Sequence, residues 1–224
     1  MELLKIFQKL SGHFHIELSS IKALWVCLSI VLSAVSLVVL NSATWILQLR
    51  DTDNSGFGPL KVCELKVSSD FMSSQRVCQN FILEVGFMNW PNSPVQVTAL
   101  LYAVGTIFLL VSAALSLISI VKEALCMTAT TWLAGYLQLS AVLVQTVGLL
   151  IFPIGLNSQF AKDFCGNSAR AFHLGHCHLG WGYVFAMINT ALLIFLPFLS
   201  KFSSKLYVQT LYANFRNSQS DMFA

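Results

Sequence analysis

Charged residues are scarce in this sequence. Asp, Glu, Lys and Arg together make up 10% of its 224 residues, whereas about 25% is usual in a soluble domain. A soluble protein of this size could not cover its surface with so few charges, and 56% of the residues are hydrophobic. The net charge of +3 is too small to indicate a nucleic-acid partner. We therefore expect a lipid bilayer to surround much of the chain.

Asp, Glu, Lys and Arg are absent from four stretches of about 20 residues or more. These stretches cover approximately 23–47, 97–121, 129–153 and 179–200. At about 1.5 Å per residue, each is long enough as a helix to span a hydrocarbon core of about 30 Å. The first stretch is longer than the apolar part of a cleaved signal peptide, so we expect it to be retained. The sequence thus predicts an all-α membrane protein, with residues 1–224 forming a single tetraspan domain.

Four spans place both termini on one side of the membrane and the larger loops, about 48–95 and 154–178, on the other. Lys22, Lys122 and Lys201 adjoin predicted helix ends on the side of the termini. Because basic residues near helix ends favour the cytosolic side, we expect cytosolic N- and C-termini. We expect the plasma membrane, although the sequence does not separate it from an internal membrane.

The cysteines support the same orientation. Cys63 and Cys78 lie in the first large loop, and Cys165 and Cys177 lie in the second. Disulfides persist in oxidising compartments, and two cysteines per loop fit one bridge in each extracellular loop. Two further cysteines, Cys27 and Cys126, are expected to be unpaired, each with a small, buried, apolar role.

The first loop also contains a strand pattern. Residues 60–67 alternate between apolar and polar with a period of two, which is typical of a strand. Residues 79–85 fit either a further strand or a helical turn. We expect a small sheet over the helices. At the other end of the chain, residues 1–20 fit either a short amphipathic helix on the inner leaflet or a loosely ordered tail.

The four uncharged stretches offer little for catalysis. Enzymes in membranes usually carry ionisable residues within their spans, and these spans have none. Their notable polar side chains are Gln138, Gln145 and Asn189. We interpret them as interhelical hydrogen-bonding groups, with a polar pathway as the alternative. The sequence contains no Cys-x-x-Cys pair that would indicate thiol chemistry. We therefore expect neither an enzyme nor a cofactor.

Three histidines, His173, His176 and His178, surround Cys177 in the second loop. Histidine and cysteine are the ligands that zinc prefers, and Cys165 is nearby in sequence. The two cysteines are better explained by an extracellular disulfide, so we predict no metal site. Exposed polar residues are the ordinary interpretation of the histidines, with pH sensing as an alternative.

Several short motifs lie between Trp132 and Ser200. They are Leu137-Gln138 in the third helix, Phe152-Pro153-Ile154-Gly155-Leu156-Asn157-Ser158 at its end, Cys165-Gly166, Leu174-Gly175-His176-Cys177, and Trp181. Together they resemble the lipoma HMGIC fusion partner-like (LHFPL) tetraspan family within the wider claudin-like group, with Leu156 replacing the usual Trp. Trp45 at the exit of the first predicted helix, and Gly58 in the first loop followed by two cysteines, fit more loosely, and Pro59 departs from the pattern.

The resemblance implies a left-handed bundle of four transmembrane helices with a small extracellular β-sheet cap. It also implies the bridges Cys63–Cys78 and Cys165–Cys177 and a non-enzymatic role as an accessory or scaffolding subunit. Such a subunit would help an ion channel or receptor to assemble, traffic or gate. A claudin-like cell–cell contact protein is the alternative, followed by a transporter or channel. The sequence does not identify the partner, the tissue or the oligomeric state, and a homo-oligomer stays open.

Overall fold

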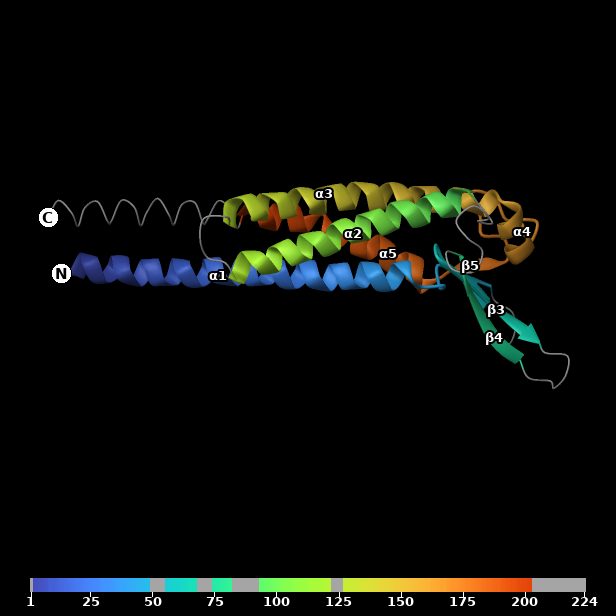
Figure 1. Ribbon diagram of the computed structural model, residues 1–224, viewed down its shortest axis with the longest axis horizontal. Coiled ribbons are helices and arrows are strands. Elements are labelled where there is room, and N and C mark those ends of the chain that lie inside the picture. Colours follow the sequence, from blue (N-terminus) through green and yellow to red (C-terminus); the bar gives the residue numbers. More distant parts are fainter. Residues whose placement is uncertain (1, 49–54, 68–73, 82–92, 122–126, 203–224) are drawn as a thin grey trace. The chain divides into compact units, whose positions relative to one another are not determined.

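A computed structural model describes the backbone of residues 2–48, 55–67, 74–81, 93–121 and 127–202 (Figure 1). Among these residues, four helical segments are long and apolar enough to cross a membrane. They are Ile21–Leu40, Ser93–Ser119, Thr130–Asn157 and Trp181–Phe202. The predicted four-span fold is therefore confirmed. The inner turn between the second and third helices, which contains Cys126, and the C-terminal tail lie outside the described residues. Cys27 is unpaired as predicted, but its side chain is exposed on the first helix rather than buried.

Helix α1 covers Glu2–Leu40 and therefore ends earlier than the predicted boundary at residue 47. The apolar stretch does continue to Leu47, but its last residues form strand β1, Ile46–Gln48. The Ser42 hydroxyl accepts a hydrogen bond from the Thr44 backbone N–H at 3.1 Å, which stabilises a turn in place of another helical turn. The helix also includes the backbone of residues 2–20, whose position on the inner leaflet stays a prediction.

Helix α2 covers Ser93–Val121, and α3 covers Met127–Ile151. At the end of α3 the chain tightens into the 3-10 helix η3, Phe152–Asn157, with Pro153 in its first turn. Proline has no N–H, so the carbonyl of Leu149 cannot receive the usual helical bond from residue 153. The Tyr183 hydroxyl donates to that carbonyl at 2.9 Å instead. This side chain compensates for the helical bond that the proline removes.

Helix α4 covers Gln159–Cys165 and is capped by Ser158, whose hydroxyl accepts from the Ala161 N–H at 3.2 Å. Helix α5 begins at Trp181 rather than at the predicted residue 179, because Cys177–Leu179 form strand β5. It runs to Leu193, and after a turn at Ile194 the chain is helical again to Phe202. Pro197 lacks the N–H that would bond to Leu193, which accounts for this interruption.

The predicted small sheet has five antiparallel strands in the order β4-β3-β2-β1-β5. Strands β2, β3 and β4 cover Ser55–Phe57, Lys61–Val67 and Ser74–Asn80. The alternating pattern of residues 60–67 thus predicted β3 correctly, and β4 agrees with a second strand as far as Asn80. Strand β5 pairs with β1, so the second loop completes a sheet that the first loop begins. The fold is that of a claudin-like tetraspan protein.

The backbone contacts divide the chain into two units. The first comprises the described parts of 1–32, 108–139 and 193–224, and the second comprises 33–107 and 140–192. A single tetraspan domain therefore stays a prediction. The second unit contains the cap, by which we mean the described residues of 41–81 and 152–180, including β1–β5, η3 and α4. Its core joins large buried side chains of the cap, such as Trp45, Phe57 and Phe152, to Tyr102 and Tyr183 of the helices.

Candidate functional site

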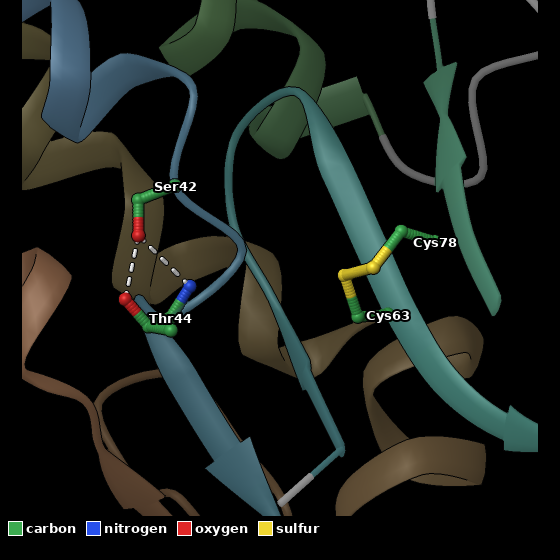
Figure 2. The surroundings of a disulfide bond; sticks show 4 residues. All are labelled: Ser42, Thr44, Cys63 and Cys78. Carbon is green, nitrogen blue, oxygen red and sulfur yellow. Dashed lines mark hydrogen bonds between the residues drawn. A yellow bond between two sulfur atoms is a disulfide. The ribbon is translucent and has the colours of Figure 1, made fainter. Parts of the chain in front are cut away.

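The first disulfide joins the two longest strands of the cap. Cys63 of β3 and Cys78 of β4 lie directly opposite each other, with their Cα atoms 4.0 Å apart (Figure 2). Their sequence separation is 15 residues. Closing a loop of this length is worth about 3 kcal/mol in the chain-entropy model. The bridge thus stabilises the hairpin of β3 and β4 at the edge of the sheet.

Two glycines allow the sheet to lie against the turn at the end of α1. Figure 2 shows the turn, in which the hydroxyls of Ser42 and Thr44 share a hydrogen bond. A Cβ atom at Gly58 would collide with the carbonyl of Ser42, and one at Gly180 would collide with the carbonyl of Thr44. The motif position Gly58 therefore has a physical explanation: only glycine permits this close approach of two backbones.

Trp45 connects the cap to the helices of its unit. Its side chain is fully buried, and its indole N–H donates to the Val39 carbonyl at 2.9 Å. Its ring centroid lies 4.9 Å from that of Phe152, 5.4 Å from Tyr183 and 5.6 Å from Tyr102. Edge-to-face and tilted contacts of this kind add to the stabilisation that burial provides. The motif residue Trp45 is therefore the centre of an aromatic cluster.

The second disulfide, between Cys165 and Cys177, links the end of α4 to β5 across 12 residues. Gly166 and Gly175 flank it with φ values of +88° and +61°, which side-chain-bearing residues rarely adopt. A Cβ atom at Gly175 would also approach the Cys165 carbonyl oxygen to 2.7 Å. The structure thus contains both bridges that the family resemblance implies. It also explains why these two motif positions are glycine.

Between the two cysteines, the chain makes a tight turn that the sequence did not predict. The backbones of Arg170 and His173 bond to each other in both directions, at 3.0 and 2.8 Å. Phe172, inside the turn, has φ of +62°, and its side chain is 69% exposed. Its N–H donates to the carbonyl of the motif residue Pro153 at 3.3 Å. An aromatic residue is therefore held on the surface in a backbone conformation that costs about 1–2 kcal/mol.

The histidines of the second loop do not converge. His173 lies in the tight turn, His176 packs against Gly166, and His178 lies in β5; all three are exposed. Cys165 and Cys177 are bonded to each other. Among the described residues, no group of three or more His, Cys, Asp or Glu side chains is placed to hold a metal ion. The histidines fit the interpretation as exposed polar residues, and pH sensing stays an untested alternative.

Gln138 joins α3 to α1 in the first unit. Its side chain is fully buried, and its Oε1 accepts from the Trp25 indole N–H at 3.3 Å. Its Nε2 donates to the Ser29 hydroxyl at 3.0 Å. Both ends of the amide are therefore paired with α1. This arrangement fits the interpretation of Gln138 as an interhelical hydrogen-bonding group.

Gln145 and Asn189 belong to a second polar cluster, in the other unit. Both donate to the hydroxyl of Ser36, Gln145 at 3.5 Å and Asn189 at 2.7 Å. Gln145 also donates to the Thr106 hydroxyl at 3.4 Å. The cluster thus connects all four membrane-spanning helices. An unpaired buried polar atom costs about 1–3 kcal/mol, and two oxygens of this cluster, Gln145 Oε1 and Asn189 Oδ1, have no hydrogen-bond partner.

Aromatic residues lie on the exposed surface near both ends of the spans. Trp181, the last of the motif residues, starts α5 and makes an edge-to-face contact with Phe185. Near the start of α3, Trp132 contacts Tyr136. Tryptophan and tyrosine are enriched where membrane spans meet the lipid headgroups. Gly155, in contrast, is a buried part of η3, where its carbonyl accepts from the Ser158 N–H at 3.1 Å.

Three residues with important roles in the structure, Ser36, Phe172 and Tyr183, are not part of the sequence motifs. Ser36 is one of several serines in an apolar stretch, and Phe172 is an ordinary aromatic residue in a loop. Tyr183 lies two residues after the motif residue Trp181, but its bond to Leu149 depends on the fold. Of these contacts, only the bond from Tyr183 to Leu149 had a usable sequence signal. Pro153 lies within a span and leaves one carbonyl unpaired, and Tyr183 in the next span can donate to it.

Comparison with known proteins gives consistent results over most of the chain. Residues 21–205 match the family described as Lipoma HMGIC fusion partner-like protein. LHFPL tetraspan subfamily member 7 protein of Xenopus tropicalis is 33% identical, over 83% of this chain and 92% of the relative. LHFPL tetraspan subfamily member 4 protein of Mus musculus is 29% identical, over 83% of this chain and 74% of the relative. LHFPL tetraspan subfamily member 2a protein of Danio rerio is 24% identical, over 80% of this chain and 84% of the relative.

Proposed function

Because this chain belongs to the LHFPL tetraspan family of multi-pass membrane proteins, we propose that it is a non-enzymatic accessory subunit of an ion channel or receptor. It would assemble with that partner in the bilayer and assist its trafficking or modulate its activity. The function rests on presenting a fixed surface rather than on transforming a substrate. The cap provides the surface, and the four spans hold it in the membrane.

One observation carries this proposal: an exposed, strained aromatic residue on a cap that two disulfides stabilise. Phe172 is 69% exposed and has φ of +62°. Strained conformations persist only when the surrounding structure enforces them, and they are often found at functional sites. Here the paired turn Arg170–His173 and the adjacent bridge Cys165–Cys177 enforce it. Rigid exposed aromatic side chains are common anchors of protein interfaces.

The orientation of the chain is part of the proposal. We infer that the cap lies outside the cell at the plasma membrane and that both termini lie in the cytosol. Two disulfides in the cap support this placement, because such bridges persist in oxidising compartments. In that orientation Phe172 faces the ectodomain of a neighbouring membrane protein.

Photo-crosslinking from position 172 tests the proposed contact. A photoreactive phenylalanine analogue replaces Phe172 in the full-length chain, which is expressed in cells that contain the native partner. We expect a crosslinked adduct of defined mass whose second component is a channel or receptor. The matched control carries the same analogue at Leu143, which is 61% exposed and lies in the middle of α3.

The same experiment distinguishes the competing interpretations. Equal yields of the same adduct from positions 143 and 172 would contradict a specific contact at the cap. No adduct with another membrane protein from either position would contradict the accessory role. An adduct that forms only between two expressing cells in contact, with this chain itself as the second component, would favour a junction protein.

A further inference from the structure

Four oxygen atoms of side chains in the second unit are buried without a hydrogen-bond partner. They are Tyr102 Oη, Gln145 Oε1, Asn189 Oδ1 and Thr190 Oγ1. Each belongs to a side chain that is at least nine-tenths buried, and each lies in a membrane-spanning segment. Lipid surrounds these segments, so bulk water cannot pair with the four atoms as it would at a soluble surface.

The four side chains belong to one cluster around Ser36. The amide nitrogen of Asn189 donates to the Ser36 hydroxyl at 2.7 Å, and that of Gln145 does so at 3.5 Å. Thr190 follows Asn189 in α5, and Tyr102 lies one turn before Thr106 in α2, where the Thr106 hydroxyl donates to the Tyr102 carbonyl at 2.8 Å. Ser36 cannot accept another bond, since its two lone pairs already receive the two amides.

Two of the four atoms can only accept a hydrogen bond, and two can also donate one. The carbonyl oxygens of Gln145 and Asn189 are acceptors, and the hydroxyls of Tyr102 and Thr190 each carry one proton. This set is the complement of a single water molecule, which donates twice and accepts twice. Buried water molecules typically make about three hydrogen bonds to polar groups that would otherwise be unpaired.

We propose that this cluster binds one water molecule in the interior of the membrane. The water donates to Gln145 Oε1 and Asn189 Oδ1, and it accepts from the hydroxyls of Tyr102 and Thr190. With Ser36 and Thr106 it completes a hydrogen-bonded network that links all four spans. A metal cation is a poorer occupant, because the predicted spans contain no Asp or Glu to balance its charge.

The same helix contains a natural control. Gln138 and Gln145 are both fully buried in α3, but the Oε1 atom of Gln138 already accepts from Trp25 Nε1. The Oε1 atom of Gln145 has no partner. The proposal therefore predicts bound water at Gln145 and none at Gln138, although the two residues have the same chemistry and the same burial.

Nuclear magnetic resonance on the full-length protein in lipid nanodiscs tests this difference. The protein is labelled with ¹⁵N at the side-chain amides of Asn and Gln, and the three buried amides are assigned from Gln138→Leu, Gln145→Leu and Asn189→Leu. We expect rotating-frame Overhauser cross-peaks between water and the amide protons of Gln145 and Asn189, with none above noise for Gln138. Equal signals at Gln138 and Gln145, or none at Gln145 and Asn189, would overturn the proposal.

Two conservative variants test which hydroxyls hold the water. Thr190→Val and Tyr102→Phe each remove one donor with little change in shape, and we expect each to weaken the water cross-peaks at least about twofold. Unchanged cross-peaks in both variants would overturn the assigned geometry. Should a variant fail to fold, the comparison of Gln138 with Gln145 in the native chain still decides the question. Amide shifts that change when sodium replaces choline in the buffer would identify a cation instead and overturn the proposal.

Discussion

At the scale of single residues, the cap depends on side chains that fit in only one way. Trp45 is fully buried among Tyr102, Phe152 and Tyr183, and Gly58 lies where a Cβ atom would strike the backbone of Ser42. These two positions contribute in opposite ways. The tryptophan stabilises the cap by filling space, whereas the glycine stabilises it by leaving space for another backbone.

Replacing Trp45 should therefore strongly destabilise the protein. We expect Trp45→Ala to lower the free energy of unfolding by about 3–5 kcal/mol, through lost burial and the cavity that remains. Thermal unfolding in a mild detergent, followed by tryptophan fluorescence and size exclusion, measures the change. The matched control is Trp132→Ala, because Trp132 is 51% exposed. A loss for Trp45→Ala no larger than that of the control would contradict the assigned role.

Gly58→Ala should be destabilising although it adds one methyl group only. The new Cβ would overlap the Ser42 carbonyl, so the strand must move away from the turn. Overpacking of this kind typically costs about 1–3 kcal/mol. Gly148→Ala in α3 is the control, since its Cβ would meet its nearest neighbour, Leu101 Cβ, at 3.3 Å. Equal melting temperatures for the two variants would disprove the close approach at Gly58.

At the scale of elements, the sequence predicted helices better than it predicted their ends. The uncharged stretches located all four spans, because lipid tolerates few charges. The end of α1 at Leu40 was missed because the apolar run continues into β1, and its stop depends on the hydroxyls of Ser42 and Thr44. Strand β5 was missed because three residues carry no reliable period, and its partner β1 is more than 120 residues away in the sequence.

The end of α3 provides a test of how elements compensate for each other. Tyr183→Phe should lower the free energy of unfolding by about 1–3 kcal/mol, because the Leu149 carbonyl then loses its donor. In a Pro153→Ala background the loss should be smaller, since the introduced alanine can donate its own N–H to the Leu149 carbonyl. The double-mutant cycle is measured by thermal unfolding. The same loss from Tyr183→Phe in both backgrounds would show that the two residues are not coupled.

At the scale of the whole molecule, the motifs between Trp132 and Ser200 indicated the family, and the family resemblance predicted the disulfide pairs. Chemistry at the candidate site was less accessible from the sequence. Gln138, Gln145 and Asn189 stood out as polar residues in apolar helices, but their partners are serines and a tryptophan with no distinctive pattern. Phe172 could not be recognised, because its exposure and its positive φ are properties of the folded chain.

The proposed orientation predicts a simple pattern of accessibility. Epitope tags fused to the N- or C-terminus should be stained by antibodies only after the cells are permeabilised. A membrane-impermeant amine reagent should modify the described lysines of the cap, Lys61 and Lys162, in intact cells, as read out by mass spectrometry. Staining of either tag on intact cells, or protection of both lysines, would contradict cytosolic termini with the cap outside.

Native co-purification with quantitative mass spectrometry tests the accessory role most directly. The tagged full-length chain is isolated in mild detergent from cells that express it naturally, with and without prior crosslinking. We predict that one channel or receptor is recovered with it in a constant molar ratio across independent preparations. Recovery of the chain alone, or only with copies of itself, under both conditions would contradict the accessory role.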